Sequence, residues 1–88
     1  MDKKVYVLTQ TDTSDPTWCY NEVYGAREDA IERMMEMYGE DILEREDVIV
    51  MESSCDPENG RAFGRIFGEM EDDIILAWNV QEHTLLER

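Results

Sequence analysis

One stretch near the C-terminus alternates in character residue by residue, and it constrains the fold more than any other part of the chain. Ile74, Leu76, Trp78 and Val80 occupy one set of alternate positions, while the other set changes from apolar to polar. Successive side chains of a β-strand point to opposite faces, so residues 74–81 are predicted to form a strand with one wholly apolar face. Such a face must be covered by a second layer.

Four other segments also have the composition of strands. Residues 3–11 are rich in β-branched and aromatic side chains, and residues 18–25 give a less regular second strand. A short apolar run opens residues 48–56, which is typical of a central strand. Residues 56–60 then hold a proline and an Asn-Gly pair, a strong hairpin signal, and residues 61–70 are predicted to return as the next strand.

The hydrophobic period changes from two residues to three and four after Ala26, which predicts an α-helix. Its apolar stripe is expected to contain Ala30, Ile31, Met34, Met35 and Tyr38. Gly39 is predicted to end the helix, because glycine readily adopts the left-handed conformation found at many helix ends. Residues 40–47 are consistent with one or two further helical turns.

The order strand, strand, helix and three strands predicts an α+β fold. We expect an antiparallel sheet of four to five strands with one main helix packed on one face, in the order ββαβββ. The 88 residues suffice for a single domain covering positions 1–88. Gly64 and Gly68 lie within a predicted strand, which indicates a bulge or the close approach of another backbone.

Several individual side chains carry predictions of their own. Trp18 and Trp78 are expected in the core, because aromatic residues provide much of the burial in a small sheet. Met37 lies off the helical stripe and is expected to be an exposed contact residue. Cys19 and Cys55 lack metal-ligand spacing, and we expect a reduced, buried pair.

The net charge limits the classes of partner that the protein can bind. Twenty-two acidic residues against eight basic ones give a net charge of −14. Direct binding to nucleic acid or to an anionic membrane is disfavoured, whereas a basic protein surface is attracted. No apolar stretch approaches the ~20 residues that span a bilayer, and residues 1–10 do not resemble a signal peptide, so we expect a cytoplasmic protein.

The acidic residues are concentrated on the predicted helix and on one predicted turn. Glu28, Glu32 and Glu36 are spaced four apart and share one helix face, where like charges repel. Residues 28–47 hold nine acids against two arginines, a net charge of −7. The candidate partner-binding residues are Glu28, Glu32, Glu36, Glu40, Glu69, Glu71, Asp72 and Asp73.

Two interpretations of this charge remain open. Carboxylates on a rigid helix present a field similar to that of a phosphate backbone, so a nucleic-acid-binding groove would be a suitable receptor. Alternatively, the charge only keeps the protein soluble. In the predicted turn at 69–73, carboxylates beside an apolar strand also oppose edge-to-edge aggregation.

No sequence motif indicates catalysis or cofactor binding. His83 has no recognisable nucleophile partner, and Ser53 and Ser54 lie in no nucleophile-elbow context. Residues 56–60 lack the alternating ligands of a calcium loop. We therefore expect neither an enzyme nor a resident metal or cofactor.

Three segments of the sequence resemble those of a loose group of small proteins. "KKVYVLTQT", "VYGAREDAIERM" and "AWNVQEHTL" resemble small uncharacterised proteins of gut bacteria, their phages and mobile elements. That group shares an opening strand, a helix with an EDAI-type start and a closing Trp-x-Val-x-Glu strand. The resemblance implies the fold and carries no activity.

The leading hypothesis is a non-enzymatic interaction protein, encoded by a phage or mobile element, that mimics nucleic acid and docks on a basic surface of a host protein. The alternative is a structural module that forms a homodimer through an apolar edge or through a face carrying Trp18 and Phe63. A third hypothesis is small-molecule binding on the open face of the sheet.

Overall fold

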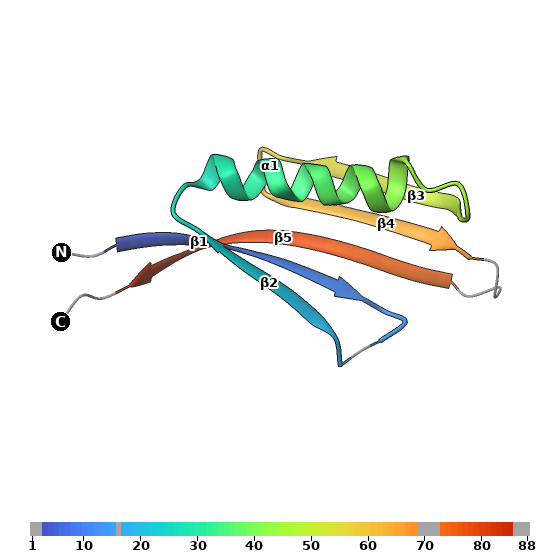
Figure 1. Cartoon of the computed structure of the whole chain (residues 1–88), viewed down its shortest axis with the longest axis horizontal. Coiled ribbons are helices and arrows are strands. Elements are labelled where there is room, and N and C mark those ends of the chain that lie inside the picture. Colours follow the sequence, from blue (N-terminus) through green and yellow to red (C-terminus); the bar gives the residue numbers. More distant parts are fainter. Residues whose placement is uncertain (1–2, 16, 69–72, 86–88) are drawn as a thin grey trace.

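The computed structural model describes residues 3–15, 17–68 and 73–85, and it shows one helix lying on a five-stranded antiparallel sheet (Figure 1). The strands are β1 (Lys3–Asp12), β2 (Cys19–Tyr24), β3 (Ile49–Asp56), β4 (Arg61–Phe67) and β5 (Asp73–Leu85). The helix α1 (Arg27–Tyr38) continues into a π-helical turn, η1 (Gly39–Leu43). The predicted α+β class is confirmed, and the order of elements differs from the predicted ββαβββ by the additional turn η1.

The order of strands across the sheet is β2-β1-β5-β4-β3. The last strand of the sequence therefore occupies the middle of the sheet, between the β1–β2 and β3–β4 hairpins. In the latter hairpin, Gly60 has a φ of +66°, the left-handed conformation expected for its Asn-Gly turn. The prediction of a central strand at residues 48–56 was wrong, because β3 lies at an edge and β5 occupies the other side of β4.

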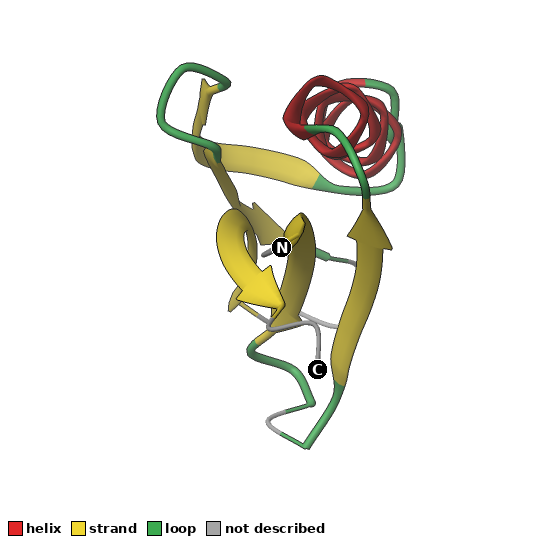
Figure 2. Ribbon diagram, turned by 90° about the vertical axis from the view of Figure 1, so that its left-hand side faces the viewer, coloured by secondary structure: helices red, strands yellow, loops and turns green. Residues whose placement is uncertain are grey.

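The sheet is strongly curved, and α1 lies on one side of it (Figure 2). Alternation along the strands assigns the side chains to two faces. The helix-covered face includes Leu8, Leu76 and Trp78, all buried. The opposite face, here called the open face, includes Phe63 and Ala77, and no described helix covers it.

The core lies between α1 and the sheet. Its largest fully buried side chains are Leu8, Met34, Ile42, Ile66 and Trp78. Tyr38 meets Trp78 in a T-shaped arrangement with ring centroids 6.0 Å apart, a geometry that favours contact between ring edge and ring face. The predicted burial of Trp78 is thus confirmed.

α1 ends at Tyr38 with Gly39 as its C-cap, as predicted, but Gly39 does not adopt the expected left-handed conformation. Its φ of −59° is right-handed, and the chain coils on through the further turn η1. Ile42 consequently reaches the core, where it is 1% exposed and fills the space above Gly64. A Cβ at Gly64 would lie 2.1 Å from Ile42 Cδ1, so the predicted close approach at this glycine is confirmed, although to a side chain.

The remaining predictions for β4 and its neighbour have different outcomes. A Cβ at Gly68 would meet nothing within 4 Å, so the structure gives no close approach there. The bulge of the sheet lies on the partner strand, between Val50 and Glu52 of β3.

Four side chains lie differently from expectation. Met35 is 48% exposed while Met37 is buried, because the stripe runs on to Ile42 and its centre is shifted. Trp18 is 41% exposed and stacks on Tyr20 at 6.4 Å, outside the core. Cys19 is exposed rather than buried; both cysteines are free thiols, and Cys55 is partly buried.

Candidate partner-binding surface

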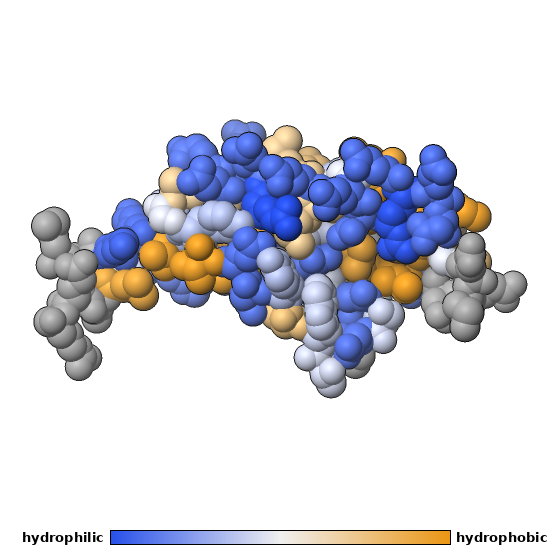
Figure 3. Space-filling view, viewed as in Figure 1, coloured by the Kyte–Doolittle hydropathy of each residue, from blue (hydrophilic) through white to orange (hydrophobic). Residues whose placement is uncertain are grey.

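The side of α1 that faces away from the sheet carries the predicted glutamates. Glu28, Glu32 and Glu36 are all exposed, because the apolar stripe of the helix is turned toward the core. In the space-filling view, hydrophilic residues extend along most of the helix (Figure 3). The four-residue spacing thus places three carboxylates along one outward face, as predicted from the sequence.

Only one of these three glutamates has an ion-pair partner in the described part of the chain. Arg33 Nη1 lies 3.2 Å from Glu36 Oε2, and Arg33 Nε lies 3.4 Å from Glu22 Oε1. Within residues 3–15, 17–68 and 73–85, no basic group approaches Glu28 or Glu32 to 4.0 Å. Their mutual repulsion costs a few tenths of a kcal/mol in an isolated helix.

The acidic residues continue past α1 through η1 and the loop that follows. Arg45 pairs with Asp47 at 2.9 Å, and this hydrogen bond holds the pKa of Asp47 below its usual range. Asp41 accepts a hydrogen bond from Gln10 at 3.2 Å. Within the described residues, six acids of this segment have neither an ion pair nor a side-chain hydrogen bond. They define the acidic helix surface: Glu28, Asp29, Glu32, Glu40, Glu44 and Glu46.

The distribution of these acids along the helix opposes the helix dipole at one end. Glu28 and Asp29 lie in the first turn, where the partial positive charge stabilises them. Glu40 and Asp41 lie in η1, and neither the last turn of α1 nor that of η1 contains a basic residue. Each acid near this C-terminal end costs roughly 0.3–1 kcal/mol.

The acidic turn predicted at residues 69–73 is described only at its last residue. Asp73 begins β5 on the open face and pairs with Arg65, whose Nη2 lies 2.5 Å from Asp73 Oδ2. This pairing holds the pKa of Asp73 below its usual range. Glu69, Glu71 and Asp72 lie outside the described residues. The structure therefore does not bring Asp73 together with the acidic helix surface, which lies beyond the opposite face of the sheet.

A polar cluster that sequence reasoning did not identify joins β2 to α1. The hydroxyls of Tyr20 and Tyr24 both donate to the carboxylate of Glu22, which Arg33 also contacts. The hydrogen bonds from Tyr20 and then Tyr24 hold the pKa of Glu22 below its usual range. Burial, followed by the bond to Glu22, raises the pKa of Tyr24 to about 12. The alternation that places Tyr20 and Glu22 on one face of the strand was the sequence feature from which this cluster could have been predicted.

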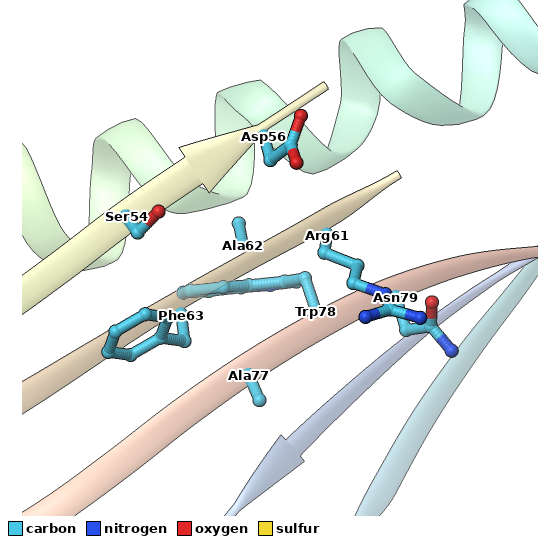
Figure 4. A pocket seen from close by; sticks show the side chains of 8 residues that line it. All are labelled: Ser54, Asp56, Arg61, Ala62, Phe63, Ala77, Trp78 and Asn79. Carbon is cyan, nitrogen blue, oxygen red and sulfur yellow. The ribbon is translucent and has the colours of Figure 1, made fainter. Parts of the chain in front are cut away.

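The open face of the sheet has a cavity of about 370 Å³ (Figure 4). Phe63 on β4 and Ala77 on β5 provide its apolar wall. The polar lining residues on that face are Ser54, Asp56, Arg61 and Asn79. The small side chain of Ala77, between larger neighbours, leaves this part of the sheet surface hollow.

No group of three or more His, Cys, Asp or Glu side chains in residues 3–15, 17–68 and 73–85 is arranged to hold a metal ion. Among the described helices, none is long and apolar enough to cross a membrane. The chain matched no protein-family model, no curated protein and no solved structure.

Proposed function

We propose that this protein is a non-enzymatic interaction protein whose acidic helix surface binds a basic surface of another protein. The observation that supports the proposal is the row of exposed carboxylates on one rigid helix, with Glu28 and Glu32 unpaired within the described residues. Fixed carboxylates of one sign create a field that attracts cationic surfaces and speeds their association.

The position of the acids favours binding over solubility as the reason for their presence. Solubility requires net charge but no particular location. Glu40 and its neighbours lie at the helix end where the dipole penalises negative charge. Loss of stability without an evident structural gain is typical of residues kept for function.

The partner that we propose is a host protein that binds nucleic acid through a basic groove. A row of carboxylates can occupy such a groove in place of phosphates, since both are anionic oxygen groups recognised by lysine and arginine. The resemblance to small proteins of phages and mobile elements is consistent with a host target. It adds no chemistry to the proposal.

A charge-reversed pair with a matched control tests the proposal. In Glu28→Lys/Glu32→Lys the surface is disrupted at two of its unpaired glutamates. In Asp15→Lys/Glu82→Lys the net charge changes equally at exposed sites in the β1–β2 loop and on β5. We expect affinity capture from bacterial lysate to lose its partners with the first pair only, and to weaken at high salt.

Capture that is unchanged by the Glu28/Glu32 reversal would disprove the proposal. Equal loss with both pairs would show that net charge alone acts. Light scattering addresses the homodimer alternative, because a salt-insensitive dimer would support it. The homodimer alternative named a face carrying both Trp18 and Phe63, and that face is not formed. Trp18 stacks on Tyr20, whereas Phe63 lines the cavity on the open face.

A further inference from the structure

The edge strand β3 exposes consecutive apolar residues. Ile49 is 65% exposed, Val50 39% and Met51 60%. The inner side of β3 pairs with β4, and no described strand pairs with its outer side. An unpaired edge is a template for another strand unless charge, proline or a bulge prevents pairing. The bulge at Met51 interrupts the first half of β3, and the register is regular from Glu52 to Asp56.

Carboxylates occur before, within and after β3 in the sequence. Glu44 and Glu46 precede β3, Glu52 lies within it, and Asp56 and Glu58 end it and follow it. A second copy pairing antiparallel would place the acidic start of one strand beside the acidic end of the other. A parallel copy would place each acid near its own equivalent. Both arrangements juxtapose like charges, so the edge disfavours self-association.

We propose that the outer edge of β3 binds an extended basic segment of a partner chain, which adds to the sheet as a further antiparallel strand. Main-chain hydrogen bonds would provide much of the affinity, as in other cases of strand addition. Lysine or arginine side chains of the segment would lie among the carboxylates that exclude a second copy. The β3 edge shares Glu44 and Glu46 with the acidic helix surface, but the strand addition does not depend on Glu28 or Glu32.

The two faces of β3 suit different side chains. Glu52 and Asp56 are paired with Arg65 and Arg61, which share the open face with Phe63, so both carboxylates lie on that face. Every second side chain of an added strand points to the open face, and we expect that row to be basic. The other row lies beside the uncharged Ser53 and Cys55 and can be apolar. We therefore expect a segment that alternates apolar and basic residues.

The opposite edge strand provides an internal comparison. β2 also lies at an edge, but its one carboxylate, Glu22, is held by Tyr20, Tyr24 and Arg33. Without a free carboxylate along β2, a basic segment has less to attract it there. Binding of the segment should therefore slow hydrogen exchange at the amides of β3 rather than at those of β2.

Peptides of defined pattern test the proposal directly. β3 has eight residues, so the probe is an eight-residue peptide of alternating valine and lysine. The first control alternates serine and lysine, which keeps the charge and removes the apolar row. The second alternates valine and glutamate. Binding is measured by calorimetry, and its location by amide hydrogen exchange at residues 49–56 and 19–24.

We expect the valine-lysine peptide to bind about tenfold or more tightly than either control and to slow exchange in β3. Ile49→Lys/Met51→Lys should abolish binding without loss of fold, because both side chains are exposed. Glu28→Lys/Glu32→Lys should leave binding within about twofold. The proposal is wrong if the serine-lysine peptide binds equally, if protection falls on β2, if no peptide binds, or if β3 instead mediates a dimer.

Discussion

Gly64 shows how one residue without a side chain allows the end of the helix to pack on the sheet. A Cβ at this position would lie 2.1 Å from Ile42 Cδ1 and 2.7 Å from its Cγ1. Ile42 is 1% exposed and has little room to move, so Gly64→Ala should destabilise the fold by about 1–3 kcal/mol. Thermal unfolding measures this, at roughly 4–8 °C per kcal/mol for a domain of this size.

The double variant Gly64→Ala/Ile42→Val tests the stated cause. Valine lacks the Cδ1 atom of the closest approach, so the double variant should be more stable than the sum of the two single changes predicts. Gly25→Ala is a control, because a Cβ there meets nothing within 4 Å. Strict additivity of the two changes would show that contact with Ile42 is not the reason for a glycine at position 64.

Glu22 stabilises the junction of β2 and α1 through its ionised form. Because Tyr20 and Tyr24 donate to the carboxylate, the pKa of Glu22 is below its ordinary value of 4.5 in the folded chain. Its contribution is therefore complete above pH 4.5 and is lost as the pH falls through the lowered folded-state pKa. We expect Glu22→Gln to lose about 1 kcal/mol at pH 7. The difference in Tm between the two proteins should shrink in acid, and a difference independent of pH would contradict this account.

Tyr24 gives the corresponding effect in alkali. Its pKa is raised from 10.0 to about 12 in the folded chain, so the fold favours the neutral phenol. That contribution is complete below pH 10 and is lost as the pH rises toward 12. Absorbance titration at alkaline pH should show a tyrosine that ionises at about pH 12 in the native protein and that is missing from Tyr24→Phe. Ionisation of all tyrosines near pH 10 in the folded state would rule this out.

At the scale of elements, the sequence predicted the strands, the helix and its end at Gly39, but it missed the right-handed conformation of Gly39 and which strands lie at the edges. The helical period is a local property, and it correctly placed Ala30, Ile31 and Met34 in the core. Gly39 permits a left-handed end without requiring one, and burial of Ile42 favours continued coiling. The position of β3 depends on which strand pairs with the far side of β4, which local patterns do not specify.

The candidate site was predictable to a similar degree. The four-residue spacing placed Glu28, Glu32 and Glu36 on one outward face, and the structure confirms that geometry. Sequence did not show that Arg33 joins Glu36 to Glu22, because that contact links the helix to a strand distant in sequence. It could not separate Asp73 from the helix acids either, since opposite faces of a sheet are distinguished only once the register is known.

Opposite ends of the helix should respond in opposite ways to the same charge reversal. Glu28→Lys places a cation at the positive end of the helix dipole, so it should lower stability by about 0.3–1 kcal/mol. Glu40→Lys, in η1, should raise stability by a similar amount, since the final turn has no basic residue. Urea unfolding at low salt measures both. Both variants should bind the basic partner more weakly, which would separate stability from binding; equal destabilisation by both would refute the dipole argument.

For the molecule as a whole, the charge of −14 is spread over a body measuring 51 × 25 × 15 Å. At 0.01 M ionic strength the Debye length of ~30 Å exceeds two of these dimensions, so acids across the molecule repel one another. At 1 M it falls to ~3 Å, which leaves mainly direct contacts. The charge thus destabilises the folded state as a whole, while each exposed ion pair returns little.

Sodium chloride should therefore stabilise the fold and weaken binding to basic partners at the same time. We expect the Tm to rise by several degrees between 0.01 M and 1 M salt, because each kcal/mol of relieved repulsion corresponds to roughly 4–8 °C. Calorimetry across the salt series measures this, and the Glu28→Lys/Glu32→Lys variant, with its smaller net charge, should gain less. An uncharged osmolyte at matched osmolality controls for general solvent effects, which would raise the Tm of both proteins equally. A Tm that falls with salt would mean that attractive pairs such as Arg65–Asp73 outweigh the repulsion, and the acidic residues would then carry no net cost to the fold.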